Sequence, residues 1–345
     1  MLMVGGNVAY VSPSTSSNSF KVGTGRETTS ILKTIFMTSL FRIGQVLKGR
    51  LGRYIITKEI QDTVWFAKNQ VEEAVVIKGV QGHPRVENER DVLKRFQDRT
   101  PYLRPLIDEI EEPSEPATIV FKYLEDHLLN ASIQKTLNRK ELKYVSRRIL
   151  GALKDVKLDN ILVNYSGGDI RFSDVQLGDL GVTYREDSKY AKAGTPVGAP
   201  MWSSPEIIME TPWNTATDIW SFGSVVISLI YGGNFNLFRP KTVSYDHEEY
   251  GLEVLKRQFR YFGPFPAKYE EIASPETVAA ILYLIDEIPQ SQTTPFERTT
   301  EREVGKKDKE FLGQIMKLDW RDRPTAGELL ENEWFKEDEE DKTLT

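Results

Sequence analysis

The stretch GALKDVKLDNILVN, residues 151 to 164, decides how this chain is interpreted. It sets Asp155, Lys157 and Asn160 close together, directly before the apolar run ILVN, which is typical of a buried strand. An asparagine beside a strand can supply an oxygen ligand to magnesium. An aspartate can accept a hydroxyl proton, and a lysine can neutralise a phosphoryl group during transfer. The spacing alone is a weak signal, because any charged turn can supply it, so the motifs around it decide its meaning.

The composition is that of a globular chain large enough for two lobes. Its 345 residues are 39% hydrophobic and 28% charged. A formal net charge of −6 disfavours a general affinity for nucleic acid, which requires a basic face. The chain has no cysteine, which excludes disulfides and thiolate metal sites, and its three histidines lie far apart in the sequence.

The two ends of the chain are predicted to be non-globular. Residues 1–40 are rich in Ser, Thr and Gly, and we expect a disordered leader rather than a transit peptide, because no arginine-rich amphipathic helix is evident. Residues 337–345 form an acidic tail. The most apolar run, residues 219–233, is too short to span a membrane and predicts a buried core helix. These features favour a cytoplasmic or nuclear location without membrane contact.

Between these ends the residue pattern changes once. Residues 41–124 contain short β-branched and aromatic runs, interrupted by one helical pattern over residues 86–96. Residues 125–336 are mainly helical, and Asn138 and Glu141 have the spacing of a capping box at the start of a helix. The sequence therefore predicts an α+β fold with a small β-rich N-lobe and a larger, mainly helical C-lobe.

A series of motifs resembles the protein-kinase superfamily, of the eukaryotic serine/threonine type. DVKLDN at 155–160 is similar to the catalytic loop of that family, and DLG at 179–181 is similar to its magnesium-binding motif. VVIK at 75–78 matches the lysine motif of its third strand, and GAPMWSSPE at 198–206 is similar to the end of its activation segment. The sequence most resembles uncharacterised fungal kinase-like proteins. FGPFPAKY at 262–269 is similar to the cyclin-dependent and SR-protein kinase branch.

The resemblance implies a two-lobe protein-kinase-like fold that uses ATP and Mg²⁺ to phosphorylate serine or threonine in a protein substrate. It implies the following site residues: Asp155 and Lys157 for catalysis, Asn160 and Asp179 for magnesium, Lys78 with Glu89 for the nucleotide phosphates, and Phe121, Lys122, Tyr123 and Leu124 around the adenine. It also implies an ion pair between Arg323 and Glu206. Thr195 is a candidate for an activating phosphate.

Two departures from the family pattern concern side chains. The positions of the three phosphate-loop glycines hold Thr57, Glu59 and Asp62. Side chains there keep the backbone away from phosphates, and the two carboxylates repel them. Ala199 stands where serine/threonine members usually have a threonine whose hydroxyl bonds the catalytic aspartate and lysine. We expect weakened nucleotide affinity and a loosely positioned catalytic pair.

A third departure lies at the start of the catalytic motif. Lys154 is followed directly by Asp155, so about ten residues of the family's usual turn, strand and His-Arg pair have no counterpart. A misplacement of about 1 Å can cost about a hundredfold in rate. Degeneration of the site and a gene model that lacks a segment both explain the gap. We expect an impaired protein kinase, and the alternative is a pseudokinase that acts as a nucleotide-binding or interaction scaffold.

Overall fold

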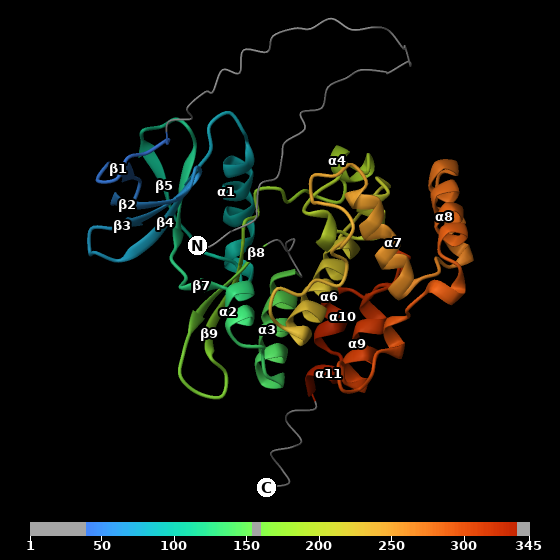
Figure 1. The fold of residues 1–345 in the computed structure, drawn as a ribbon. Helices are drawn as coiled ribbons and strands as arrows, with labels where there is room; N and C mark the ends of the chain where they lie inside the picture. The colour runs from blue at the N-terminus through green and yellow to red at the C-terminus, as the bar shows by residue number, and fades with distance from the viewer. Residues whose placement is uncertain (1–38, 154–159, 337–345) are drawn as a thin grey trace, which may run out of the picture.

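The computed structural model describes residues 39–153 and 160–336 of the chain, and for Asn160 it describes the backbone alone. Asp155 and Lys157, both predicted to be catalytic, lie outside the described residues, as do most of the predicted leader and the whole predicted tail. Two lobes are visible in Figure 1, a sheet-rich one formed by the blue and teal part of the chain and a helical one formed by the rest. The predicted division into a β-rich and a helical part is therefore present.

The N-lobe is a small barrel with one helix packed against it. Its strands run in the order β1-β2-β3-β4-β6-β5, and neighbouring strands pair antiparallel. They are β1 (Val46–Gly49), β2 (Arg53–Gln61), β3 (Val64–Lys68), β4 (Ala74–Gly79), β5 (Leu106–Glu112) and β6 (Thr118–Lys122). Alternate side chains point inward, as the two-residue period of a strand requires. They form a buried core that includes Leu47, Ile56, Trp65, Ile77 and Val120.

Helix α1 (Arg85–Phe96) covers this barrel on the side that faces the C-lobe (Figure 1). Its buried residues Val86, Glu89 and Leu93 recur at helical spacing and form one face, whereas most of the remaining side chains are charged. A glutamate on the buried face must have a partner there, because a buried charge is costly without one. This glutamate is Glu89, and its partners define the site described below.

Three short strands connect the lobes. They are β7 (Asp126–His127), β8 (Asn160–Tyr165) and β9 (Phe172–Gly178), paired antiparallel in the order β7-β8-β9. The register places Asn160 opposite Gly178, directly before Asp179. Two chain segments that carry predicted magnesium ligands are thereby brought side by side.

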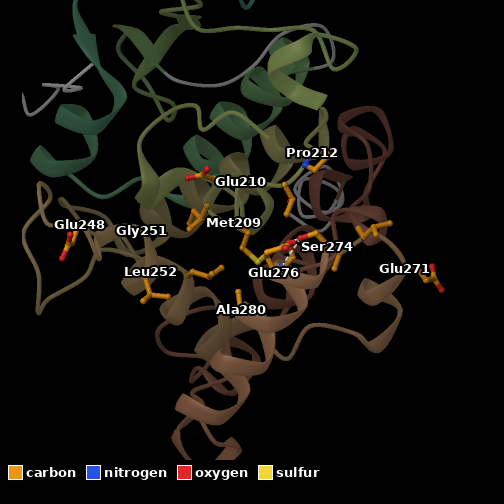
Figure 2. Close-up of a pocket in the computed structure, with 16 residues that line it drawn as sticks. Met209, Glu210, Pro212, Glu248, Gly251, Leu252, Glu271, Ser274, Glu276 and Ala280 are labelled. Atoms are coloured by element: carbon orange, nitrogen blue, oxygen red, sulfur yellow. Dashed lines mark hydrogen bonds between the residues drawn. The ribbon is translucent and has the colours of Figure 1, made fainter. Parts of the chain in front are cut away.

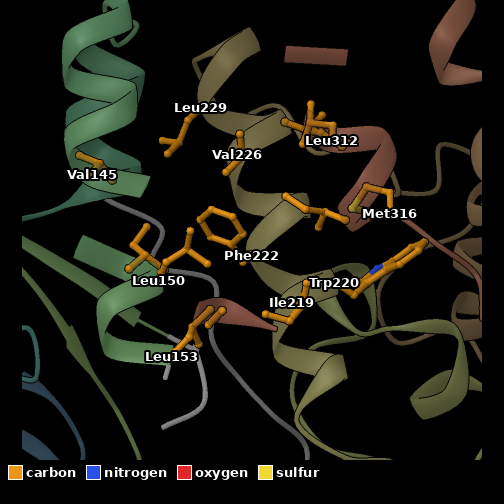
Figure 3. Packing of buried hydrophobic residues seen from close by; sticks show 14 of the residues in the cluster. Val145, Leu150, Leu153, Ile219, Trp220, Phe222, Val226, Leu229, Leu312 and Met316 are labelled. Carbon is orange, nitrogen blue, oxygen red and sulfur yellow. The ribbon is translucent and has the colours of Figure 1, made fainter. Parts of the chain in front are cut away.

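The C-lobe is built around α6 (Ala216–Tyr231), which contains all but the last two residues of the apolar run at 219–233. Twelve of its residues are less than a tenth exposed, so the predicted buried core helix is confirmed. Figure 3 shows Phe222 of α6 between Leu150 of α3 (Arg139–Leu153) and Leu312 of α9 (Lys306–Ile315). The described residues contain no helix that is both long and apolar enough to cross a membrane.

The other helices surround α6. They are α2 (Leu128–Gln134), α3 (Arg139–Leu153), α4 (Lys189–Lys192), α5 (Pro205–Ile208), α6 itself (Ala216–Tyr231), α7 (Tyr250–Phe262), α8 (Pro275–Glu287), α9 (Lys306–Ile315), α10 (Ala326–Leu330) and α11 (Glu333–Lys336). The predicted capping box begins α3. The Asn138 side chain accepts a hydrogen bond from the Glu141 N–H at 2.9 Å, and the Glu141 carboxylate accepts one from the Asn138 N–H at 3.0 Å.

A buried ion pair fixes the end of the segment that precedes α6. Arg323 donates to both carboxylate oxygens of Glu206, at 2.7 and 2.8 Å, and both side chains are almost fully buried. Arg323 also donates to the carbonyl oxygens of Ala216 and Lys317. The predicted pair between Arg323 and Glu206 is confirmed, and its bidentate geometry holds residues far apart in the sequence together.

Candidate active site

A cluster of charged side chains lies where the N-lobe meets the C-lobe. Lys78 Nζ lies 2.7 Å from Glu89 Oε2 and 2.5 Å from Asp179 Oδ1. We call Lys78, Glu89 and Asp179, together with Phe121 and Lys122, the interlobe site. The pairing follows from the local structures, because strand β4 turns Lys78 toward α1, and the helical period turns Glu89 toward the strand.

Glu89 joins three parts of the chain. One carboxylate oxygen binds Lys78, and the other accepts a hydrogen bond from the backbone N–H of Leu180 at 3.0 Å. The side chain of Glu89 is 1% exposed, so its negative charge depends on these two contacts. The position of α1 is therefore coupled to the backbone directly after Asp179.

Asp179 is held by two cations. Oδ1 accepts hydrogen bonds from Lys78 at 2.5 Å and from Arg85 at 3.0 Å. Burial by itself would raise the pKa of Asp179, but the charges and hydrogen bonds of Lys78 and Arg85 outweigh it and hold that pKa below its usual range. The carboxylate is therefore ionised at neutral pH, as a magnesium ligand must be. The backbone of Asp179 has a φ of 56°, a conformation that is uncommon outside glycine.

Arg85 and Asn88 extend this arrangement along α1, and neither is predicted from the sequence. The Asn88 side-chain amide donates to the carbonyl oxygens of Gly181 and Thr183, both at 3.0 Å. A Cβ on Gly181 would lie 2.9 Å from the Arg85 carbonyl oxygen, so only glycine permits this approach. The sequence gives little sign of the roles of Arg85 and Asn88, since both look like ordinary polar residues at the start of a helix.

The predicted adenine-contacting residues lie at the end of β6 and just beyond it. Phe121 is buried opposite Val76 of β4, and Leu124 is also buried. Tyr123 packs edge-on against Phe66, with 5.5 Å between the ring centroids. The Lys122 side chain binds Asp174 at 2.9 Å, so its ammonium group is engaged by β9. Because β6 pairs with β4, these residues lie on, or just beyond, the strand next to the one that carries Lys78.

Arg104 is a further residue of this region that is not predicted from the sequence. Its Nε donates to the carbonyl oxygen of Lys122 at 2.9 Å, and its guanidinium carbon lies 4.8 Å from the centre of the Phe121 ring. Its backbone N–H donates to Leu177 of β9 at 2.8 Å. The sequence signal is a single arginine within the otherwise apolar extended piece LRPLI, residues 103–107.

The magnesium-binding prediction rests on a small set of donors. The described residues contain no group of three or more His, Asp or Glu side chains placed to hold a metal ion. Asp179 supplies a carboxylate, and the backbone of Asn160 lies beside Gly178, although its side chain is outside the described part. These donors fit magnesium held mainly by substrate phosphates and water, with one or two protein ligands.

Comparison with known proteins identifies the family. A family model described as "Protein kinase domain" matches residues 42–335, which is most of the chain. The chain belongs to the protein kinase domain family. The predicted membership of the protein-kinase superfamily is therefore confirmed.

Two curated relatives of this kinase domain are serine/threonine-protein kinases. The chain is 33% identical over 105 residues to serine/threonine-protein kinase 4 homolog A of Dictyostelium discoideum, which covers 28% of this chain and 22% of that protein. It is 29% identical over 125 residues to serine/threonine-protein kinase pak-2 of Caenorhabditis elegans, which covers 33% of this chain and 23% of that protein. The matched region thus spans less than a quarter of either relative.

A solved structure confirms the fold. The kinase domain resembles a chain in the crystal structure of the yeast RNA Pol II CTD kinase CTDK-1 complex, with a TM-score of 0.64 and 18% sequence identity. The likeness covers 82% of this chain and 92% of that chain. The predicted α+β, two-lobe kinase fold is therefore confirmed.

The kinase domain has a hairpin with two breaks in its register where its family has the glycine-rich phosphate loop. Strands β2 and β3 pair up to Gln61 and Val64, which leaves only Asp62 and Thr63 in the turn. Thr57 uses its hydroxyl to donate to the Phe66 carbonyl oxygen across the hairpin, and the Glu59 side chain is exposed. None of the positions of Thr57, Glu59 and Asp62 has the glycine that would let a phosphate approach the backbone closely.

A groove of about 900 Å³ lies on the C-lobe and shares no residue with the interlobe site. Figure 2 shows Met209, Leu252 and Ala280 around it, with Glu248 and Glu271 toward its two sides. Its lining residues include no lysine or arginine. A groove without cations does not suit phosphate groups, so the phosphoryl chemistry is assigned to the interlobe site.

Proposed function

We propose that this kinase domain binds a nucleoside triphosphate at the interlobe site and transfers its γ-phosphoryl group to a serine or threonine of a protein. The observation that carries the proposal is the contact of Lys78 with both Glu89 and Asp179. A lysine held by a buried glutamate is fixed in position to receive phosphate oxygens. The family uses ATP with Mg²⁺, and the fit of Asp179 to magnesium supports the same choice for this chain.

In the proposed reaction, the acceptor hydroxyl oxygen forms a bond to the γ-phosphorus while the bond from that phosphorus to the bridging oxygen breaks. The nucleoside diphosphate leaves, and the hydroxyl proton passes to Asp155. Lys157 neutralises the transferring group, and Lys78 orients the phosphates that stay behind. Asp179 and Asn160 would hold magnesium, which supplies charge neutralisation for the phosphates when bound. Asp155, Lys157 and the Asn160 side chain have their parts assigned by sequence motif alone.

The direct test is transfer of labelled γ-phosphate from Mg·ATP, and in parallel from Mg·GTP, to a generic protein substrate. We expect slow transfer by the unmodified chain and none by Asp179→Asn. Asp91→Asn is the matched control, because Asp91 lies on the exposed side of α1 and pairs with Arg90. Equal transfer by the unmodified chain and by Asp179→Asn would refute the proposed site.

A second candidate function is an interaction scaffold without catalysis. The hairpin between β2 and β3 favours it, because Thr57, Glu59 and Asp62 stand at the three glycine positions and keep phosphate from approaching the backbone closely. The double engagement of Asp179 by Lys78 and Arg85 favours it as well, since a metal ion must compete with two cations already present. In this case the partner is a protein in the cytosol or nucleus.

A variant with a family-like turn and strand inserted before Asp155 separates the two candidates. A gain in transfer over the unmodified chain supports an impaired kinase whose defect lies at the junction of Lys154 and Asp155. If neither chain transfers phosphate while both bind nucleotide, the scaffold is supported. Binding is to be measured by calorimetry on the same preparations.

A further inference from the structure

Arg104 lies at the edge of the interlobe site, between β6 and β9. Its Nε donates to the Lys122 carbonyl oxygen, and its guanidinium group stacks over Phe121. Both residues belong to the segment that we assign to the nucleotide base. A cation therefore lies against the part of the site assigned to the base. The family resemblance implied Phe121 and residues 122–124 for this part, and it did not include Arg104.

The side chain of Arg104 packs beside Gly178 of β9. A Cβ at Gly178 would lie 3.5 Å from Arg104 Cδ and 3.3 Å from Leu162 Cδ1. The arginine stem thus passes close to the residue that precedes Asp179. The backbone N–H of Arg104 donates to the carbonyl oxygen of Leu177 in β9, which fixes the Cα of Arg104 beside that strand.

The guanidinium group of Arg104 stays charged in this position. Burial lowers the pKa of Arg104 to about 10, while the negative charges of Glu89 and Asp179 oppose that change. The group is therefore protonated at neutral pH. The cation also contributes, after burial, to a lowered pKa of His127 in β7, so its field reaches the first strand of the C-lobe.

The hydrogen-bonding capacity of Arg104 is only partly used. Within the described residues its side-chain hydrogen bond comes from Nε, and Arg104 is half-buried. A guanidinium group has five N–H donors and no acceptor. The two terminal nitrogens are therefore available to a ligand, whereas the Lys122 carbonyl oxygen already accepts a hydrogen bond. Arg104 therefore adds a set of donors to the polar edge offered to a base.

We propose that Arg104 makes this site select a purine triphosphate with a carbonyl oxygen at the 6-position, such as a guanine nucleotide, over an adenine nucleotide. The 6-amino group of adenine is a donor and meets the donors of Arg104 unfavourably. The 6-oxygen and N7 of guanine are both acceptors, and arginine binds this pair with two hydrogen bonds. The inference rests on the proposed nucleotide site and adds the identity of the base.

The test is calorimetric binding of Mg·GTP, Mg·ITP and Mg·ATP to the full chain and to Arg104→Met. ITP has the 6-oxygen of GTP without its 2-amino group, so it isolates the contact in question. Methionine keeps an unbranched stem and removes every donor. Arg148→Met is the matched control, because Arg148 also stacks on an aromatic ring, 4.7 Å from the centre of Tyr102, without contacting Phe121.

We expect the unmodified chain and Arg148→Met to bind GTP and ITP roughly tenfold more tightly than ATP, and Arg104→Met to lose this preference. Tighter or equal binding of ATP by the unmodified chain would overturn the base preference and leave the nucleotide site intact. Binding of ATP by Arg104→Met alone would also overturn it, since Arg104 would then block the site. If no variant binds any of the three, the proposed nucleotide site itself fails, and the preference fails with it.

Discussion

The carboxylate of Glu89 accepts a hydrogen bond from the backbone N–H of Leu180 at 3.0 Å. The contact joins a buried helix residue of the N-lobe to the residue that follows Asp179. Because the other oxygen of Glu89 binds Lys78, one side chain sets the positions of both the lysine and the aspartate of the interlobe site. The arrangement is the assembled one that phosphoryl transfer in this family requires.

Replacement of Glu89 is expected to destabilise the chain. Glu89→Ala leaves Lys78 with less compensation in a buried position and should lower the free energy of unfolding by about 3 kcal/mol. Urea denaturation measures the change. Asp91→Ala, on the exposed side of the same helix, should change that free energy by less than about 0.5 kcal/mol. Equal effects of the two substitutions would show that the buried contacts of Glu89 are not important for stability.

The ion pair between Arg323 and Glu206 predicts a larger and separable effect. Arg323→Met should lower the free energy of unfolding by roughly 3–5 kcal/mol, because Glu206 would remain buried without its partner. The double variant with Glu206→Met should recover part of this loss, since an apolar pair can replace a buried ion pair. Denaturant titration of the unmodified chain, Arg323→Met, Glu206→Met and the double variant completes a double-mutant cycle. An additive cycle would contradict the account.

The lowered pKa of Asp179 predicts a pH dependence of stability. A carboxylate whose pKa is lower in the folded chain than in the unfolded chain stabilises the fold above its ordinary pKa of 3.8. This contribution is lost as the pH falls through the folded-state pKa. The difference in unfolding free energy between the unmodified chain and Asp179→Asn should therefore shrink from about pH 5 to about pH 3. A difference that stays constant over this range would argue against an ionic role for Asp179.

Asn88 predicts a change in local dynamics. Asn88→Ala removes both hydrogen bonds from α1 to the carbonyl oxygens of Gly181 and Thr183. Hydrogen exchange followed by mass spectrometry should show faster exchange in residues 180–184, while exchange in the C-lobe core stays slow. Unchanged protection of residues 180–184 would mean that other contacts suffice to hold this segment.

Local pattern and motif spacing were sufficient to predict much of the fold. The β-branched runs, the buried run at 219–233 and the capping box at Asn138 each depend on neighbouring residues, and the structure has all three. The pair between Arg323 and Glu206 is a long-range contact, and it was predicted only because both residues lie in recognisable family motifs.

Arg85, Asn88 and Arg104 could not be predicted in the same way. Each contacts residues that are distant in the sequence, and none of the three belongs to a family motif identified in the sequence. Arg104 contacts Lys122 only because β5, β6 and β9 converge beside it. A charged residue in an apolar extended segment was the one available signal, and such a residue is more often at the surface.

The most direct test of the account is the magnesium dependence of nucleotide binding by the unmodified chain and by Asp179→Asn. Calorimetric titration with ATP and with GTP should show binding that tightens with magnesium in the unmodified chain and is insensitive to magnesium in Asp179→Asn. Identical magnesium dependence in the two proteins, or no binding by either, would contradict the assignment of Lys78, Glu89 and Asp179 as a nucleotide site.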